Sequence, residues 1–391
     1  MLGSSPEALR VGLFSNIYRP IISGVVNSID LLRKELLNQG HCPFVFAPRV
    51  PGYRDAHSGV WRFPSVQLSR RVNYPLAIPC WPPTHYAISQ SRLNVVHTHH
   101  PFWLGEVGWM WAKIRKIPLV YTFHTQYEQY CHYIKLPQAP LRAATRWAVQ
   151  SFARRCDLII APSSAIREVM QDMGIATWTE TLPNAIDLER FQGRRDRRAL
   201  RQQLGWPQEA PIAIFAGRLG REKNLPFLLQ AFTRVPGACL AIVGDGPDLP
   251  ALRQQAQELG VTERILFTGG ASYPEMPDYY AAADFFCISS TTEVKPLVVL
   301  EALASRLPVV AVSACGTADT VNHGYDGLLT SEKLDDFAGA CSRLCDDRKL
   351  RMDMSEEAGR SAENYSIERY AGRLVELYRE ARRRLNASGV A

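Results

Sequence analysis

The stretch FFCISSTTEVKPLVVLEALAS (285–305) contains a strand, a loop and a helix in immediate succession. The apolar run at 285–289 predicts a buried strand. A helix is expected from about Leu297, with Pro296 in its first turn, where the missing N–H costs nothing. Glu293 lies in the loop and Glu301 in the second helical turn. A short apolar strand followed by a helix is typical of βαβ units and a parallel sheet.

The same alternation recurs along almost the whole chain and predicts an α/β protein with two doubly wound, Rossmann-like domains. The first series of strands is expected at 10–16, 43–48, 94–99, 118–123 and 157–162, and the second at 211–217, 239–244, 264–269, 285–289 and 308–313. Ligands bind beyond the carboxyl ends of the strands in such sheets. If the two sheets face each other, the cleft between the domains is the expected active site.

Composition and charge exclude several classes of protein. The 391 residues are 46% hydrophobic and 21% charged, as in soluble globular proteins and unlike disordered or fibrous ones. The net charge of +7 is unevenly distributed, because 20 of the 45 basic but only 12 of the 38 acidic residues precede position 191. Six of the eight tryptophans lie between 49 and 155. One half is therefore basic and aromatic, and the other is neutral.

Targeting and cysteine patterns favour the cytosol. No apolar run approaches the roughly 18 to 20 residues that cross a bilayer, and the start of the chain does not resemble a secretory signal. The nine cysteines are scattered without a CxxC pair, so neither a disulfide framework nor a zinc knuckle is indicated.

Positive side chains follow the first strand of the second series, in GRLGREKN (217–224). Arg218 and Lys223 precede a helix expected near Leu225, and cations beside a helix N-terminus suit a diphosphate. A solvated basic loop is the alternative. The next strand ends at Gly244 and Asp245, where a glycine permits either close approach to a ligand or simply a tight turn.

The two carboxylates of the opening stretch could accept hydrogen bonds from the hydroxyl groups of a nucleotide sugar, while the helix start holds its phosphate or sugar oxygens. A surface position is the alternative for Glu301. The apolar residues around it, however, predict burial, and a buried carboxylate needs a partner.

Histidines gather after two strands of the first series. His124 follows the strand at 118–123, where it could contact substrate or play a structural role. His97, His99 and His100 form the sequence HTHH (97–100). Metal binding is disfavoured there, because neighbouring strand residues point to opposite faces and no cysteine or carboxylate is near in sequence.

These fragments, taken in order, resemble the family 4 retaining glycosyltransferases with the GT-B fold. Within that family, TFHTQYEQYCHYI (122–134) and TEVKPLVVLEAL (292–303) most resemble the branch that glycosylates diacylglycerol, including bacterial diacylglycerol glucosyltransferases. The motifs that carry the likeness are Ser23 with Gly24, HTHHPF (97–102), TFHTQY (122–127), PNAID (183–187), GRLGREKN (217–224), GDGP (244–247), the paired glutamates and HGYDGLL (323–329).

The resemblance implies a role for each site residue. Arg218 and Lys223 would stabilise the leaving diphosphate in place of a metal ion, Glu293 would contact the transferred sugar and Glu301 the ribose. His124 would touch the donor sugar near the reacting carbon, and no cofactor is implied. The implied donor-binding set is Gly24, Arg218, Lys223, Gly244, Asp245, Glu293, Lys295, Pro296, Leu297, Val298 and Glu301. The catalytic set is His124, Arg218, Lys223 and Glu293.

The family pattern also implies the domain plan and three departures. The acceptor domain would span 1–188, the donor domain 189–366, and a C-terminal helix at 367–391 would cross back to the first domain. Pro296 replaces a common glycine and lacks an N–H donor. Ala185 and Arg306 also replace common glycines, and Arg306 lies where a glycine usually ends the helix.

A lipid acceptor would require the basic half to contact a membrane. Each Lys or Arg near an anionic surface contributes about 1 kcal/mol. The contacts are expected from Arg70, Arg71 and Trp81, and from Arg142 and Arg146 on a helix at 140–155, for which an ordinary surface helix is an equal alternative. The expected substrates are UDP-glucose and diacylglycerol or a glycolipid, at the inner leaflet of the cytoplasmic membrane.

Three other functions remain open. The enzyme could use a soluble sugar, sugar-phosphate or polysaccharide acceptor, or it could be a nucleotide-sugar epimerase, which turns over without an acceptor. A nucleic-acid or membrane-binding module without activity is disfavoured by the intact donor motifs, and no nucleic-acid partner is expected.

Overall fold

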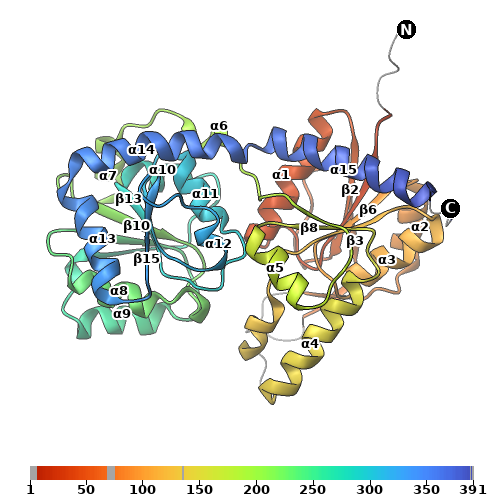
Figure 1. Cartoon of the computed structure of the whole chain (residues 1–391), viewed down its shortest axis with the longest axis horizontal. Helices are drawn as coiled ribbons and strands as arrows, with labels where there is room; N and C mark the ends of the chain where they lie inside the picture. Colours follow the sequence, from red (N-terminus) through yellow and green to blue (C-terminus); the bar gives the residue numbers. More distant parts are fainter. Residues whose placement is uncertain (1–6, 68–74, 134–135, 388, 390–391) are drawn as a thin grey trace, which may run out of the picture. The chain divides into compact units, whose positions relative to one another are not determined.

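The computed structural model describes residues 7–67, 75–133, 136–387 and 389, and the chain divides into two compact units (Figure 1). The first comprises Met1–Asn184 and Ile367–Ala391, and the second Ala185–Ser366. The division thus falls at Asn184, inside the PNAID turn, rather than at 188.

The first unit is built on a seven-stranded sheet in the order β3-β2-β1-β6-β7-β8-β9, with every neighbouring pair parallel. Its strands are β1 (Arg10–Phe14), β2 (Cys42–Pro48), β3 (Val60–Phe63), β6 (Val95–Thr98), β7 (Leu119–Thr122), β8 (Leu158–Ala161) and β9 (Thr179–Thr181), and a small antiparallel pair adds β4 (Ser65–Val66) and β5 (Leu76–Ala77). Its helices are α1 (Gly24–Asn38), α2 (Pro82–Gln90), α3 (Leu104–Arg115), η1 (Tyr127–Tyr133), α4 (Gln138–Ala153), α5 (Ser164–Asp172) and α15 (Ile367–Ala387).

The second unit is built on a six-stranded sheet in the order β12-β11-β10-β13-β14-β15, also parallel throughout. Its strands are β10 (Ile212–Ala216), β11 (Cys239–Val243), β12 (Ile265–Gly269), β13 (Phe285–Ile288), β14 (Val309–Val312) and β15 (Gly327–Thr330). Its helices are α6 (Leu188–Gln192), α7 (Arg197–Leu204), η2 (Arg221–Lys223), α8 (Leu225–Thr233), α9 (Leu249–Glu258), η3 (Thr262–Arg264), α10 (Met276–Ala282), α11 (Leu297–Ala304), α12 (Cys315–Ala318), α13 (Leu334–Asp346), α14 (Arg348–Ala362) and η4 (Glu363–Tyr365).

The expected α/β architecture is confirmed, and all ten predicted strands are present. Three strands of the two main sheets were not predicted, and each lies at a sheet edge: β3, β9 and β15. They are short, and β9 consists of the polar residues TET. The predictions relied on apolar runs, which edge strands do not need because fewer elements cover them.

The return of the C-terminal helix to the first unit is also confirmed. The buried face of α15 packs into the same core as α1 and one face of the sheet. The residues of α15 that join this core are Ala371, Leu374, Val375, Leu377 and Tyr378.

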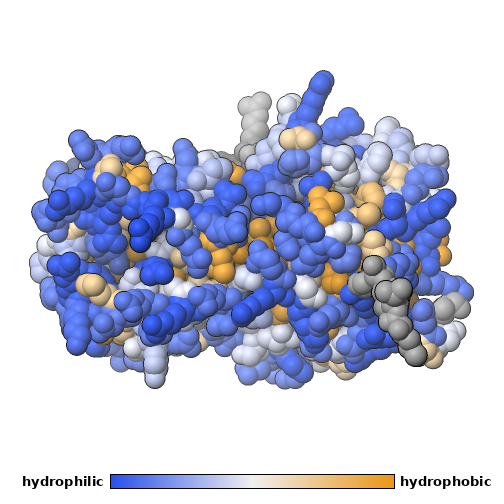
Figure 2. All heavy atoms as spheres, turned by 90° about the horizontal axis from the view of Figure 1, so that it is seen from above, coloured by the Kyte–Doolittle hydropathy of each residue, from blue (hydrophilic) through white to orange (hydrophobic). Residues whose placement is uncertain are grey.

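On the face shown in Figure 2, hydrophilic side chains predominate and apolar ones lie in small separate groups.

Two of the unusual residues have distinct local structures. Ala185 is buried and does not need a left-handed backbone. Arg306 has a φ of +58°, so it adopts the left-handed conformation that ends α11 and that glycine favours. The backbone N–H of Leu307 reaches back to the carbonyl of Ala302 at 2.9 Å, which completes the helix end.

Each sheet has one point at which the strand order reverses. In the first unit it lies between β1 and β6, and in the second between β10 and β13. The loops that leave neighbouring strands in opposite directions open a crevice there, at the carboxyl ends of the strands. The segments that follow these four strands hold most of the predicted site residues.

Candidate functional site

At the crevice of the second unit, Lys223 forms an ion pair with Glu293. Lys223 lies at the end of η2, after β10, and Glu293 lies in the loop after β13. The Nζ atom of Lys223 donates to Oε1 of Glu293, and the two side chains are only 19% and 15% exposed. The structure thus brings together two predicted residues that are 70 positions apart in sequence.

Two serines that the sequence analysis missed hold this arrangement in place. Ser289 Oγ donates to the carbonyls of Lys223 and Asn224, both at 3.0 Å, and Ser290 Oγ donates to the carbonyl of Glu222 at 2.8 Å. The end of β13 therefore fixes the η2 segment. The sequence feature that could have identified these two serines is a pair of hydroxyl residues directly after an apolar strand.

Gly316 supports the loop of Glu293 from the other side. Its N–H donates to the carbonyl of Glu293 at 2.9 Å. A Cβ at this position would lie 2.3 Å from the carbonyl oxygen of Val294, so only glycine fits. Nothing in the local sequence marked this glycine, because its constraint comes from a segment more than twenty residues away.

Glu301 is buried in α11, only 4% exposed. Its Oε2 accepts a hydrogen bond from the hydroxyl of Tyr280 at 2.9 Å, so Tyr280 is the partner that the sequence analysis required without naming. Burial raises the pKa of Glu301 to about 7, against the opposing effects of the Tyr280 hydrogen bond and the charge of Arg190. The carboxyl group of Glu301 therefore titrates near neutral pH in its apolar setting. Tyr280 occupies only one of its lone pairs, so the others can accept further hydrogen bonds.

The helix that carries Glu301 begins as predicted. Pro296 is the N-cap residue, with φ −71° and ψ 114°, and α11 starts at Leu297. The first-turn amides, including those of Leu297 and Val298, have no acceptor inside the helix. An anionic or carbonyl oxygen is the natural ligand of such a helix start.

Lys295 turns away from the Glu293 side chain. It is 5% exposed, its Nζ donates to the carbonyl of Asp319 at 3.0 Å and lies 5.0 Å from the ring centre of Tyr365. Burial lowers the pKa of Lys295 to about 8. These contacts favour a structural role for its side chain, whereas its backbone stays next to the helix start.

The glycines after β11 bring two loops together. A Cβ on Gly244 would lie 1.9 Å from the carbonyl oxygen of Gly217, and one on Gly246 would lie 2.2 Å from that of Leu219. Asp245 accepts from the N–H of Gly246 at 2.7 Å and is exposed. The close packing of the two loops explains these glycines directly, which neither ligand approach nor a tight turn had described. It also places the exposed Arg218 beside the turn.

Four histidines of the first unit, His97, His99, His100 and His124, lie in or shortly after β6 and β7. His99 Nδ1 and His124 Nε2 are hydrogen-bonded at 2.9 Å, although His99 follows β6 and His124 follows β7. His97 is held between Thr122 and Tyr378 of α15, both at 2.7 Å. His100 Nδ1 lies 3.3 Å from the hydroxyl of Ser15, directly after β1.

Burial keeps these four rings neutral. It lowers the pKa of His97 and His124 to about 3 and that of His100 to about 4, and it lowers the pKa of His99 well below its usual range. At neutral pH, His124 is therefore an uncharged hydrogen-bonding group. Within the described part of the chain, no three histidine, cysteine or acidic side chains are grouped as they would be around a metal ion.

Gly24 is the first residue of α1 in the same unit, and Ser23 caps the helix by accepting from the N–H of Val26 at 3.2 Å. This glycine-started helix begins after the loop that leaves β1. The first unit thus places a helix N-terminus and His124 at one end of its sheet.

Three of the five predicted membrane contacts lie within the described residues. Arg70 and Arg71 lie outside the described residues. Trp81 is 42% exposed, and Arg142 is exposed on α4. The side chain of Arg146 makes a contact inside the protein, because it donates a hydrogen bond to the carbonyl of Asp172 at 3.0 Å.

The helix α4 has features of both hypotheses made for it, an ordinary surface helix and a helix that contacts a membrane. Phe152 near its end is buried and packs edge-on against Tyr121, with ring centres 5.5 Å apart. Towards its start the helix is mostly exposed, and the side chain of Trp147 is 69% exposed. Among the described helices, none is long and apolar enough to cross a membrane.

Comparison with known proteins agrees with this geometry. Residues 22–190 match the model of "Glycosyltransferase Family 4", and residues 196–361 match that of "Glycosyl transferases group 1". The fold is similar to that of Anabaena HepE in complex with UDP-glucose, with a TM-score of 0.78 and 21% identity over 95% of this chain and 99% of that one.

Two curated relatives share one name, alpha-monoglucosyldiacylglycerol synthase. That of Streptococcus pneumoniae is 34% identical over 314 residues, covering 78% of this chain and 71% of the relative. That of Acholeplasma laidlawii is 28% identical over 398 residues, covering 95% and 96%. The chain is therefore a hexosyltransferase that belongs to glycosyltransferase family 4, has the GT-B fold and lies in the branch of the alpha-monoglucosyldiacylglycerol synthases.

Proposed function

We propose that this enzyme transfers glucose from UDP-glucose to diacylglycerol at a membrane surface, with retention of the anomeric configuration. The observation that carries the proposal is the Lys223–Glu293 pair beside the buried Glu301–Tyr280 pair, at the crevice of a unit whose relatives are named for monoglucosyldiacylglycerol synthesis.

In this proposal, Arg218 and Lys223 hold the donor diphosphate. Their fixed charges would stabilise the negative charge that grows on the leaving phosphate, so no metal ion is needed. The first-turn amides of α11 would bind phosphate or sugar oxygens. Glu293 both orients the Lys223 ammonium and offers a free carboxylate oxygen to the hydroxyl groups of the sugar.

Glu301 would hold the ribose. A carboxylate at this depth offers several lone pairs, and Tyr280 uses one of them. Gly24 and the neutral His124 of the first unit are proposed to contact the diphosphate and the sugar, respectively. An uncharged imidazole can hydrogen-bond a sugar hydroxyl without opposing the positive charge that develops at the reacting carbon.

Chemically, the bond between the anomeric carbon and the diphosphate oxygen breaks as the acceptor oxygen bonds to that carbon from the same face. The departing phosphate accepts the proton of the acceptor hydroxyl, so UDP and the glucolipid are the two products. This step needs no pair of catalytic carboxylates, unlike glycoside hydrolysis.

Membrane association is proposed through the first unit. The exposed Trp147 and Arg142 of α4 and the exposed Trp81 suit the headgroup region, where tryptophan and basic side chains are stable. The enzyme would then work from the cytoplasmic side, with its acceptor drawn from the inner leaflet.

A matrix of donors and acceptors tests the proposal. UDP-glucose, UDP-galactose and GDP-mannose are each incubated with diacylglycerol in mixed vesicles, with soluble sugar phosphates and with no acceptor, and the products are identified by mass spectrometry. We expect glucosyldiacylglycerol from UDP-glucose, and its loss in Glu293→Gln. Transfer only to soluble acceptors, or turnover without acceptor, would refute the proposal.

A further inference from the structure

The second unit contains a cavity of about 460 Å³ that the proposed reaction does not use. It lies beside α7 and the ends of α10 and α11. Asp284 next to it accepts from the N–H of Ile212 at 2.8 Å, so the cavity is near the amino ends of β10 and β13. The crevice with Lys223 and Glu293 is at the carboxyl ends. The residues that line the cavity are Phe191, Gln192, Gly193, Arg194, Arg195, Arg197, Ala281, Ala304, Ser305, Arg306 and Ser355.

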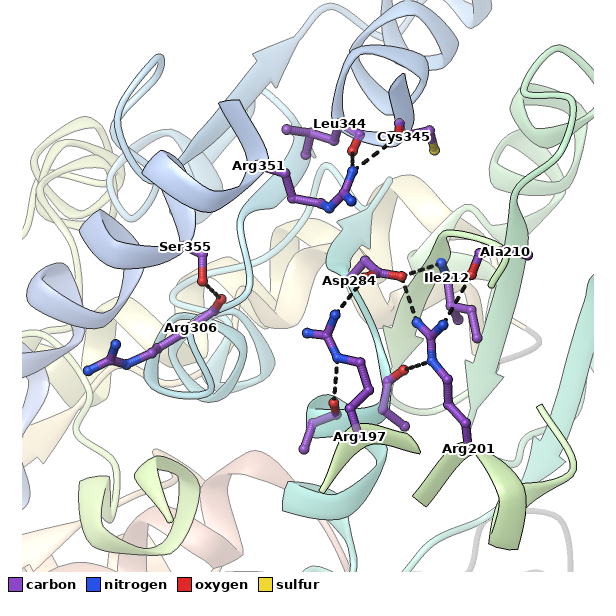
Figure 3. Close-up of polar contacts among 12 residues, drawn as sticks. Arg197, Arg201, Ala210, Ile212, Asp284, Arg306, Leu344, Cys345, Arg351 and Ser355 are labelled. Carbon is purple, nitrogen blue, oxygen red and sulfur yellow. Dashed lines mark hydrogen bonds and ion pairs between the residues drawn. The ribbon is translucent and has the colours of Figure 1, made fainter. Parts of the chain in front are cut away.

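The lining is strongly cationic, with four arginines and no carboxylate. Arg197 lies 2.7 Å from Asp284, but the same carboxylate also binds Arg201 at 2.7 Å, so one negative charge serves two guanidinium groups. Arg195 pairs with Asp278 at 2.7 Å. Figure 3 shows Arg197 and Arg201 converging on Asp284, and Arg306 standing apart from them beside Ser355.

Arg306 supplies a cation at a position where glycine would be easier to accommodate. A left-handed backbone costs a non-glycine residue about 1 kcal/mol, and nothing in the fold of α11 requires a side chain there. The Ser355 hydroxyl holds the carbonyl of Arg306 at 2.7 Å. The absence of a side chain at Gly359 leaves room for its stem, because a Cβ there would lie 3.1 Å from Cγ of Arg306.

A polar group without a partner adds to the cationic lining. The Oγ atom of Ser305 is buried and makes no hydrogen bond in the structure. The smaller adjoining cavity, of about 360 Å³, shares Gln192 and Arg306 but also contains Glu356 and Glu363 beside Arg360. Its two carboxylates match its two arginines, Arg306 and Arg360. The larger cavity has only arginines among its charged lining residues, and Arg306 is the cation that the two cavities share.

We propose that the larger cavity binds a phosphate group, carried either by a small solute or by an acidic phospholipid. Guanidinium groups match phosphate oxygens through paired N–H donors, and four of them line this cavity, whose lining contains no carboxylate. The volume admits more than a bare phosphate ion. The three arginines of the basic run that line the cavity, Arg194, Arg195 and Arg197, then share one function with Arg306.

Calorimetric titration of the full chain with inorganic phosphate and with glycerol phosphate tests the site. Arg306→Gly removes a cation and also the left-handed strain, so it should fold at least as well as the wild type. We expect it to raise the Kd about tenfold, and Arg194→Gln to act in the same direction. Arg198→Gln is the matched control, because this neighbouring side chain is 85% exposed and does not line the cavity.

The source of the phosphate is distinguished with vesicles. Sedimentation with phosphatidylcholine vesicles, with and without phosphatidylglycerol, is compared for Arg306→Gly and Arg198→Gln. If Arg306→Gly alone weakens binding to the acidic vesicles, the ligand is a phospholipid headgroup. If it weakens only the binding of soluble phosphates, the ligand is a solute. Equal binding by wild type, Arg306→Gly and Arg194→Gln in both assays would overturn the proposal.

Discussion

At the scale of single residues, the donor crevice depends on two buried polar pairs of different kinds. Lys223 and Glu293 are oppositely charged and partly accessible, as is required of groups that meet a charged substrate. Glu301 and Tyr280 are fully enclosed, and burial raises the pKa values of both. The first pair is suited to the charge of a diphosphate and the second to neutral hydroxyl groups.

Replacing Lys223 tests the first pair. Lys223→Met keeps the length of the side chain but removes the charge that would stabilise the leaving group, so kcat should fall about 10²- to 10³-fold. Arg221→Met is the control, because Arg221 is exposed in the same short η2 segment. Steady-state kinetics with UDP-glucose would measure both. A kcat for Lys223→Met within threefold of the wild type would exclude this role.

Glu301 should make stability depend on pH. Its pKa is raised from 4.5 to about 7, so the folded state keeps a proton between these pH values after the unfolded state has released its own. The stabilising contribution of Glu301 is therefore largest at low pH and declines as the pH rises to about 7. Relative to wild type, Glu301→Gln should gain up to about 3 kcal/mol in unfolding free energy between pH 5 and 7.5.

Urea denaturation at the two pH values measures this gain. Glu258→Gln, at an exposed position on α9, should show no such trend. A constant difference between Glu301→Gln and wild type across this range would show that Glu301 ionises normally in the folded protein.

At the scale of elements, the loops at the end of β13 are positioned by segments distant in sequence. The serines after β13 hold η2, and α12 holds the loop of Glu293 through the N–H of Gly316. These contacts explain how the loop can hold the Glu293 carboxylate with little freedom. A side chain added to α12 at Gly316 would therefore press against this loop and displace it.

Gly316→Ala should therefore damage activity. The added methyl group would meet the backbone of Val294 at 2.3 Å and displace Glu293, so kcat/KM should fall at least about tenfold. Gly339→Ala is the control, because its added Cβ meets nothing within 4 Å and it lies inside α13. That variant should be fully active and slightly more stable. Equal activity of the two variants would argue against the positioning of Glu293 by α12.

The exposed half of α4 leads to a prediction for membrane binding. Trp147→Ala removes a large exposed ring and should weaken binding to anionic vesicles roughly tenfold, as expected from the apolar area. Its unfolding free energy should change by less than about 0.5 kcal/mol, because the side chain packs little. Met352→Ala, which removes a smaller apolar side chain that is 56% exposed on α14, is the control. Binding is measured by vesicle sedimentation. If both variants bind the vesicles equally, α4 does not contribute to the membrane contact.

At the scale of the whole molecule, the sequence was sufficient for the parts whose signals are local. Apolar runs located ten strands, and ordered motifs identified the family. The proline also predicted the start of α11 at Leu297. The assignment of Lys223 and the glutamates to a donor site stays a prediction. Each strand and each single motif lies within about twenty consecutive residues, and the order of the motifs is evident from the chain itself.

The remaining parts depend on distant contacts, which a single sequence does not display. Tyr280 meets Glu301 across 21 positions, and Tyr378 meets His97 across 281. Edge strands such as β9 have no apolar run to reveal them. The Lys295 side chain likewise contacts Asp319 and Tyr365, which are distant in sequence, so the local sequence could not predict these contacts.

The central claim is the transfer of glucose from UDP-glucose to a lipid with retention. It is tested most directly by NMR of the product formed from UDP-glucose labelled with ¹³C at the anomeric carbon, with diacylglycerol in anionic vesicles. The account predicts a single labelled product, α-glucosyldiacylglycerol, formed in equal amount with UDP. A β-linked product, free labelled glucose or label remaining in UDP-glucose would contradict it.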